Sequence, residues 1–362
     1  MRSLIANIIA KLSKFSVEQL HLGKGSALPG RVALALDPNF VKNFNDHFKN
    51  GSFNFFVSGT NGKTTSSGIL ASIIKIATKK QPINNAFGAN LYYGIASELV
   101  NSSKLDLKLD SEDFVFEIDE AAFRLVAKDL KPKAVVLTNI FRDQLDRFGE
   151  INATQKLIQD GLEAIAIDAT KLFLNANDEK IAEFKSILSD SFDIYFYKVD
   201  NVDIAFKEGN VDMSIVEGDI FTASLVERRV NGSLMKLSYK LDAIEAFLPI
   251  AGDFNVYNAC AAAAAAYHSG ISLEDIKNGI EAYVGAFGRG EKISYENKNL
   301  NVFLIKNPAG ATEVINFVSQ FQSSKVLIAI NDNYADGRDV SWLWDARFEN
   351  FLDKDMDFVC TG

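Results

Sequence analysis

A lysine and a threonine, Lys63 and Thr64, stand directly after a short glycine turn, and this pair of side chains is suited to binding phosphate. The turn follows the apolar run 53–57, which predicts a buried strand, and precedes apolar residues at helical spacing as far as Ala77. Backbone N–H groups at the start of such a helix point at an anion. Lys63 would then reach the outer phosphates of a nucleoside triphosphate, and the Thr64 hydroxyl would bind Mg²⁺. The predicted contacts to the nucleotide in this loop are Gly59, Thr60, Asn61, Gly62, Lys63, Thr64 and Thr65.

One position of the loop departs from the strict Walker A pattern, because Val57 stands where that pattern has glycine, five residues before Gly62. A second interpretation is therefore a glycine turn that only caps a helix and leaves Lys63 in solvent. We favour phosphate binding because the predicted strand and helix both fall where a phosphate-binding loop needs them. The sequence thus predicts an ATP site.

An acidic cluster ends the next predicted strand, at residues 114–118. Its first member, Glu117, could hold Mg²⁺ directly or through water, since Mg²⁺ binds a few carboxylates together with phosphate oxygens. The alternative is that Glu117 caps a helix or is solvated. Two later predicted strands end at Asn139 and Asn175, and open α/β sheets bind ligands past the carboxyl ends of their strands. We therefore expect Thr64 and Glu117 to share one metal site.

Composition limits the partners and the compartment. A formal net charge of -9 argues against nucleic acid as the main partner. The two cysteines, Cys260 and Cys360, cannot build a disulfide framework or a Cys-based zinc site, which fits a reducing cytoplasm. No apolar stretch is long enough to span a bilayer. The amphipathic residues 4–15 are interrupted by Asn7 and Lys11, which predicts a helix packed on the body rather than a signal peptide; a membrane-surface helix is the alternative.

The order of the elements predicts an α/β fold. Apolar strands alternate with helical segments up to about residue 195, which is typical of a parallel sheet covered on both faces. Short alternating runs within about 195–240 predict antiparallel hairpins, inserted in or appended to the sheet. Glycines around Arg289 predict a hinge into a smaller Rossmann-like α/β domain, which with three strands and two helices would be incomplete. The predicted divisions are a helix and lead-in (1–50), a central ATP-binding domain (51–288) and a C-terminal, partner-docking domain (289–362).

Five motifs carry a family resemblance. Residues 59–65 resemble the ATP loop of the Mur ligases and folylpolyglutamate synthetases, which phosphorylate a carboxylate to an acyl phosphate that an amine then attacks. Within that superfamily, residues 117–121, 139–150, 306–310 and 331–342 resemble the MurT branch, the ATP-using subunits of lipid II isoglutaminyl synthases. These matches span nearly the whole chain. The resemblance implies a Mur ligase-like central P-loop domain and a smaller C-terminal domain.

The resemblance also implies a reaction. MurT proteins convert the α-carboxylate of D-glutamate in the lipid II stem peptide to the amide, which gives D-isoglutamine. They use ATP and Mg²⁺, and a GatD-like glutamine amidotransferase subunit supplies the ammonia. The implied place of work is the cytoplasmic face of the plasma membrane, where lipid II lies.

Residue roles follow from the same motifs. The implied catalytic residues are Lys63, Glu117 and Asp339. Asp339 would complete a Cys-His-Asp triad with the amidotransferase, although from its spacing alone it could equally cap a helix near Ser341. The other implied contacts are Thr64 and Glu117 with Mg²⁺, Asn258 with adenine, and Arg289 and Lys306 with the nucleotide from the last domain.

Two departures from the family keep alternatives open. MurT proteins commonly carry a four-cysteine zinc ribbon, but residues 195–240 contain no cysteine or histidine, so we predict no structural zinc. The short last domain leaves room for a nucleotide-binding scaffold that does not turn over ATP. An amino-acid ligase of the Mur or folylpolyglutamate type is the other alternative; Gln144, where those ligases usually have histidine, speaks against it.

Overall fold

The computed structural model describes most of the chain, and every structural statement below refers to the part it describes. The described residues are 1–19, 27–49, 51–85, 89–141, 151–165, 170–188, 192–202, 214–216, 218–229, 231–285, 289–296, 298–320, 325–333, 340–352 and 356–362. The motif residues 142–150, with Gln144, and residues 334–339, with Asp339, lie outside this set.

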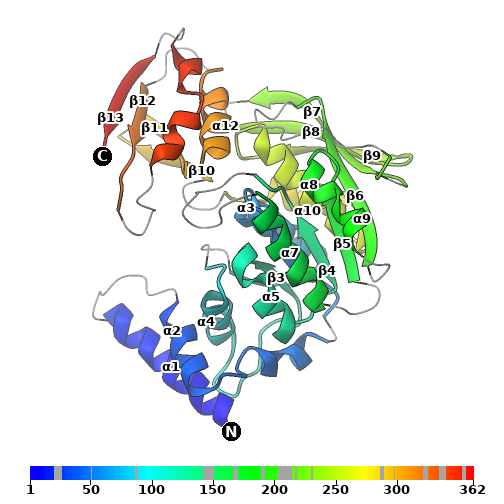
Figure 1. Cartoon of the computed structure of the whole chain (residues 1–362), viewed down its shortest axis with the longest axis vertical. Coiled ribbons are helices and arrows are strands. Elements are labelled where there is room, and N and C mark those ends of the chain that lie inside the picture. The colour runs from blue at the N-terminus through cyan, green and yellow to red at the C-terminus, as the bar shows by residue number, and fades with distance from the viewer. Residues whose placement is uncertain are drawn as a thin grey trace.

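A nine-stranded sheet forms the centre of the molecule (Figure 1), in the order β2-β3-β1-β4-β5-β6-β7-β8-β9. Strands β2 to β7 pair in parallel, and β8 and β9 continue the sheet as an antiparallel meander. The strands are β1 (Asn54–Ser58), β2 (Ile83–Asn84), β3 (Phe114–Glu117), β4 (Ala134–Leu137), β5 (Thr170–Asn175), β6 (Phe192–Asp200), β7 (Phe221–Arg229), β8 (Gly232–Tyr239) and β9 (Asp242–Leu248).

Helices cover both faces of this sheet because its central strands alternate side chains between two apolar cores. Phe55 and Val57 of β1 join one core, whereas Phe56 between them joins the other. The first core contains α3 (Lys63–Thr78), α10 (Phe254–His268) and α11 (Leu273–Glu281). The second contains α4 (Tyr92–Ser102), α5 (Glu120–Asp129), α7 (Ile151–Ile165), α8 (Glu179–Ala182) and α9 (Phe184–Ile187). The predicted parallel sheet with two covered faces is confirmed.

The N-terminal lobe packs beside α4. It consists of α1 (Arg2–Gln19), α2 (Leu28–Leu36) and the 3-10 helix η1 (Lys42–Phe48). Ala6 and Ala10 of α1 are fully buried against this lobe, and small side chains allow the helices to approach closely. The first helix therefore packs on the body, as predicted.

The C-terminal region is smaller, and the residues of its strands β11, β12 and β13 are mostly exposed. It contains β10 (Arg289–Tyr295), β11 (Lys298–Phe303), α12 (Pro308–Val318), β12 (Lys325–Ala329), η2 (Ser341–Asp345), η3 (Phe348–Phe351) and β13 (Asp357–Thr361). Strands β10 and β11 form an antiparallel pair, and β12 and β13 a parallel pair.

The antiparallel hairpin expected within about 195–240 is confirmed by the pairing of β7 with β8. The parallel pairing of β6 with β7, which extends the sheet before that hairpin, was not expected. Strand β10 was not expected, since its apolar side chains do not form a clear alternating run. The helix expected near Trp342–Phe351 is two short 3-10 helices, because Ala346 is extended and breaks it.

Candidate nucleotide-binding site

The phosphate loop lies between the end of β1 and the first turn of α3. Gly62 caps α3 with φ +83°, a left-handed conformation that glycine adopts without strain. A Cβ atom at Gly62 would lie 2.0 Å from Oδ1 of Asn258, so this position also needs glycine for space. The loop and the start of α10 are thus packed directly against each other.

Lys63 is buried at the start of α3 and points back over the loop. Its Nζ lies 2.9 Å from Oε1 of Glu120 and also donates to the carbonyl oxygens of Gly59 and Thr60. Burial by itself lowers the pKa of Lys63, but the carboxylates of Glu120 and Glu117 outweigh it and raise the pKa above its usual value. The lysine therefore stays charged in a site with little water.

Glu117 and Thr64 meet beside this lysine. The Thr64 hydroxyl donates to Oε2 of Glu117 over 2.6 Å, and Asn90 Nδ2 donates to Oε1 over 3.1 Å. The Asn85 side chain holds the Glu117 backbone: its Nδ2 donates to the Glu117 carbonyl, and its Oδ1 accepts from the Glu117 N–H. The helix cap in this cluster is Asp119, which accepts from the Ala121 N–H, so Glu117 is neither a cap nor a solvated acid.

The ends of β4 and β5 hold the other side of the loop. Asn139 accepts from the Asn61 N–H over 2.8 Å and donates to the Asn61 carbonyl over 3.0 Å. Thr138 also donates to the Asn61 carbonyl. Asn175 donates to the Thr138 carbonyl, which ties the end of β5 to that of β4. These polar strand ends, expected near the ligand, thus fix the backbone of the loop.

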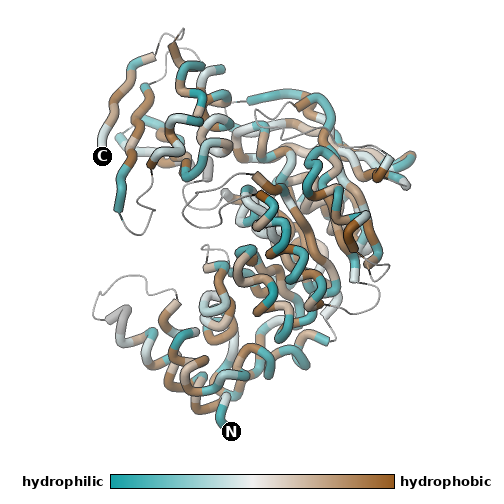
Figure 2. The backbone as a smooth tube through the Cα atoms, in the orientation of Figure 1, coloured by the Kyte–Doolittle hydropathy of each residue, from teal (hydrophilic) through white to brown (hydrophobic). Residues whose placement is uncertain are grey.

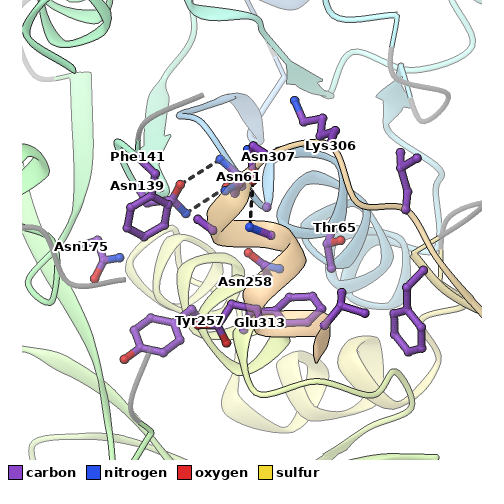
Figure 3. Close-up of a pocket in the computed structure, with 17 residues that line it drawn as sticks. Asn61, Thr65, Asn139, Phe141, Asn175, Tyr257, Asn258, Lys306, Asn307 and Glu313 are labelled. Carbon is purple, nitrogen blue, oxygen red and sulfur yellow. Dashed lines mark hydrogen bonds between the residues drawn. The ribbon is translucent and has the colours of Figure 1, made fainter. Parts of the chain in front are cut away.

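A pocket lies between the loop, the strand ends, α10 and the C-terminal region (Figure 3). Asn61, Thr65, Asn139 and Asn258 line the central side, and the opposite wall comes from the segment around α12. The residues of that wall are Phe303, Leu304, Lys306, Asn307, Ala309, Gly310, Glu313 and Val314.

One hydrogen bond joins the two walls directly. Asn307 Nδ2 donates to Asn61 Oδ1 over 3.0 Å, while Asn307 Oδ1 accepts from the Gly310 N–H and caps α12 (Figure 3). Asn307 is fully buried. A single side chain therefore links the phosphate loop to the first turn of α12.

Comparisons with known proteins identify the family. Residues 57–266 match the family "Mur ligase middle domain", and residues 304–362 match "MurT ligase C-terminal". The chain is 32% identical to the lipid II isoglutaminyl synthase (glutamine-hydrolyzing) subunit MurT of Staphylococcus aureus strain COL, over 100% of this chain and 85% of that protein. The subunit of the same name from Streptococcus pneumoniae R6 is also 32% identical, over 94% of this chain and 80% of that protein. This chain belongs to the MurT family of Mur ligases.

Solved structures agree on the fold. MurF from Acinetobacter baumannii superposes with a TM-score of 0.67 at 19% identity, covering 92% of this chain and 77% of that chain. MurF from Thermotoga maritima, solved with ADP, gives a TM-score of 0.66 at 13% identity, covering 89% and 73%. The predicted fold, a Mur ligase-like P-loop domain with a small C-terminal domain, is confirmed, as is membership of a family of ATP-using ligases.

The described structure brings together most of the residues expected at a MurT nucleotide site. Thr64 is hydrogen-bonded to Glu117, and Lys63 lies close enough to feel the Glu117 charge while it pairs with Glu120. Asn258 and Lys306 line the adjoining pocket. Arg289 begins β10, but its side chain lies outside the described residues, as does Asp339. Whether each residue plays its expected role stays a prediction.

Two residues of the site were missed by sequence reasoning. Glu120 was seen only as part of an acidic cluster, although its place three residues after Glu117 could have put it on the first turn of the following helix. Asn307 was quoted only within a motif. Its position directly before Pro308 is a helix-start signal, because proline favours the first helical position.

Proposed function

We propose that this chain is the synthetase subunit that amidates the α-carboxylate of D-glutamate in the lipid II stem peptide, using ATP and ammonia. One observation carries the proposal. At the start of α3 the buried Lys63 lies beside Thr64, whose hydroxyl donates to Oε2 of Glu117 over 2.6 Å, and the chain aligns along its whole length with a MurT subunit. Both relatives are named as subunits of a glutamine-hydrolyzing synthase, which supports a partner that releases ammonia from glutamine.

The reaction has two steps. A carboxylate oxygen of the substrate forms a bond to the γ-phosphorus of ATP as the bond to the bridging oxygen breaks, which releases ADP and leaves an acyl phosphate. Ammonia then bonds to the carboxyl carbon. The bond between that carbon and the phosphate oxygen breaks, inorganic phosphate leaves with the electron pair, and one proton passes from nitrogen to solvent. Lys63 and the N–H groups at the start of α3 would stabilise the negative charge that develops on the phosphoryl group.

Magnesium fits the oxygen atoms that Thr64 and Glu117 present. Mg²⁺ prefers hard oxygen ligands and binds proteins through one or two carboxylates plus phosphate oxygens. No group of three or more His, Cys, Asp or Glu side chains suited to a metal occurs among the described residues. This fits a metal held mainly by the nucleotide, which would draw charge from the phosphates. The absence of a structural zinc site stays a prediction.

The remaining roles belong to the same proposal. Asn258, packed against Gly62 in the pocket, would contact the adenine, and Lys306 with Arg289 would approach the nucleotide from the C-terminal domain. A GatD-like amidotransferase would dock on that domain, where Asp339 would orient the histidine of the partner. The domain divisions at residues 50 and 288 are part of this proposal, as is work at the cytoplasmic face of the plasma membrane.

Mass spectrometry of the stem peptide tests the proposal. Lipid II, ATP and Mg²⁺ are incubated with this chain, once with ammonium salt and once with glutamine plus a GatD-like subunit. We expect a carboxamide in both reactions and none with the Lys63→Ala variant. A carboxamide only with ammonium would refute the docking part alone. If neither reaction yields an amide while ATP still binds, the synthetase proposal is wrong and the amino-acid ligase or scaffold interpretation takes its place.

A further inference from the structure

The first helix leaves a row of large apolar side chains in solvent. Ile5, Ile8, Ile9, Leu12 and Phe15 of α1 are each between 36% and 60% exposed. At 3.6 residues per turn they fall within an arc of about 120° on one side of the helix. Isolated exposed apolar residues are common, but a continuous row of this kind marks an interaction surface. We call these residues the α1 apolar row.

The row cannot turn inward, because the opposite side of α1 is fixed to the body. Ala6 and Ala10 are fully buried there. Asn7 donates to the Lys104 carbonyl over 2.8 Å and accepts from the Ser103 hydroxyl over 3.0 Å. Figure 1 shows α1 at the outer edge of the N-terminal lobe, away from the nine-stranded sheet, and Figure 2 shows both hydrophobic and hydrophilic segments along it. The α1 apolar row is therefore a fixed outward surface of the folded chain.

Positive charge accompanies the row, although the chain as a whole is acidic. Helix α1 carries Arg2, Lys11 and Lys14 against one acidic residue, Glu18, whereas the whole chain has a net charge of -9. On the helix, Arg2 and Lys11 fall on opposite sides of the apolar arc. Hydrogen bonds to the carbonyl oxygens of Leu36 and Val100 hold these two side chains in place. The row thus has a cationic border on both sides.

The acidic groups of the neighbouring elements are already engaged. Asp37 is buried and accepts from Ser3 and Asn43. Glu98 of α4 accepts from the Ser102 hydroxyl. The exposed Asp110 pairs with Lys104 over 3.5 Å. The positive charge beside the row is therefore that of Arg2 and Lys11 of α1.

We propose that α1 lies in the interface of an anionic membrane, with the α1 apolar row among the upper acyl chains and Arg2 and Lys11 among the headgroups. An apolar row bordered by basic residues is the pattern of helices that lie in the membrane interface. A second copy of this chain fits less well, because facing helices would bring like charges together. No helix among the described residues is long and apolar enough to cross a membrane, so α1 would lie on the surface.

This inference gives the proposed function a location, and its value for catalysis rests on that function. A substrate linked to lipid stays in the membrane plane, so an enzyme held at the surface meets it at a raised local concentration. Membrane binding itself does not depend on the reaction, and it can be measured without ATP or lipid II.

Flotation of the full chain with lipid vesicles tests the proposal. Mixed phosphatidylglycerol–phosphatidylcholine vesicles are compared with pure phosphatidylcholine vesicles, with and without the amidotransferase subunit. We expect binding to the anionic vesicles and a drop of at least roughly tenfold for the double variant Leu12→Glu, Phe15→Glu. The matched control, Leu241→Glu with Val284→Glu, makes the same charge change at two exposed apolar residues elsewhere and should bind like the wild type.

A milder variant tests the electrostatic part without adding charge to the apolar row. Replacing Arg2 and Lys11 by glutamine should lower the preference for anionic over neutral vesicles by about tenfold. Circular dichroism checks that each variant is folded. Absence of wild-type binding, or equal binding by the Leu12/Phe15 variant, overturns the proposal. The proposal is also overturned if light scattering shows that the wild type self-associates, that the Leu12/Phe15 variant does not, and that neither protein binds vesicles.

Activity separates this inference from the proposed function. Amidation of vesicle-embedded lipid II should fall in the Leu12/Phe15 variant, whereas amidation of a water-soluble, short-chain analogue should be unchanged. If the wild type binds vesicles but yields no amide on either substrate, the proposed function fails and the membrane surface stands. If the wild type and the Leu12/Phe15 variant amidate embedded lipid II at equal rates, the α1 apolar row does not contribute to the reaction.

Discussion

The two ends of helix α10 lie in contrasting surroundings: the start is buried, whereas the end is half-buried. At its start, Asn258 lies against the phosphate loop and donates to Asn255, while the loop pairs Lys63 with Glu120 and Thr64 with Glu117. At its end, His268 is packed among aromatic rings. Those rings are Phe173, Tyr195, Tyr239 and Tyr267.

The difference lies in how buried polar groups are compensated. Around the loop, the charged and amide side chains named above have hydrogen-bond or ionic partners. At the far end, Nε2 of His268 is buried and has no hydrogen-bond partner in the part of the chain that the structure describes. Compensated charge in a ligand-binding pocket indicates chemistry, whereas an uncompensated imidazole in an aromatic cluster indicates packing. We therefore expect changes at the first end to reduce activity, and changes at the second to alter stability alone.

Removal of the lysine should give the largest effect. In Lys63→Ala the cation that faces the transferring phosphoryl group is lost, and we expect the amidation rate to fall by about a thousandfold. The buried Glu120 would lose its partner, which should cost about 3 kcal/mol of folding free energy. Single-turnover kinetics and urea unfolding measure the two losses.

The double variant Lys63→Ala, Glu120→Gln separates these losses. It removes the unpaired charge, so stability should return while activity does not. If activity returned with stability, Lys63 would be a structural residue, and the contrast between the two ends of α10 would disappear.

The metal site should show the next largest effect. Glu117→Gln keeps the shape of the side chain but removes the charge beside Thr64, and we expect the rate to fall by about a hundredfold, with part of the loss regained at high Mg²⁺. The rate is measured against Mg²⁺ concentration. Asn90→Ala is the matched control, since it removes one hydrogen bond to Glu117 and leaves the carboxylate. A Mg²⁺ dependence equal to that of the wild type would contradict the assignment.

The link between the two walls of the pocket should show a smaller effect. Asn307→Asp keeps an oxygen that can accept from the Gly310 N–H, but it replaces the donor to Asn61 with a second oxygen. We expect the KM for ATP to rise several-fold with little loss of stability. Asn307→Ala removes the helix cap as well and should cost about 1 kcal/mol of folding free energy. Equal KM values for Asn307→Asp and the wild type would show that this hydrogen bond does not shape the site.

How much of this site the sequence predicts depends on how far apart its residues are along the chain. The loop and the Glu117 strand end were predictable, because the spacing of glycine, lysine and apolar residues is local and the carboxyl ends of parallel strands share one edge. Which carboxylate pairs with which loop residue was not, because Glu117, Asp119 and Glu120 are close in sequence and differ only in the direction of their side chains.

Contacts between distant segments escaped prediction. Asn61 and Asn307 are 246 residues apart, and nothing in either motif indicates their hydrogen bond. The parallel pairing of β6 with β7 was missed for a related reason, since alternation within a strand shows its faces but not its neighbour. The outward side of α1 was equally hidden, because the apolar spacing of a helix does not tell whether a partner covers it.

The smallest effect on activity should come from the far end of α10. Burial, together with nearby Lys171 and Lys240, lowers the pKa of His268 to about 4, below its usual value of 6.5. Between these pH values the unfolded chain binds a proton at this residue that the folded chain does not, so folding stability falls as the pH drops from 6.5 towards 4. His268→Phe removes this difference and keeps an aromatic ring among its neighbours. Urea unfolding at pH 7.5 and pH 5 should therefore show a smaller loss for the variant than for the wild type, with amidation at neutral pH unchanged.

Tyr195→Phe provides the matched control for that experiment, because it changes a ring beside His268 but keeps the imidazole. Tyr195→Phe should lose as much stability as the wild type between the two pH values, since His268 is still present. Equal losses for His268→Phe and the wild type would mean that His268 is not kept neutral by its surroundings. A large fall in amidation by His268→Phe at neutral pH would be the more instructive failure. It would mean that the aromatic end of α10 holds its asparagine end in place, and that one rigid helix carries a packing change from the cluster to the phosphate loop.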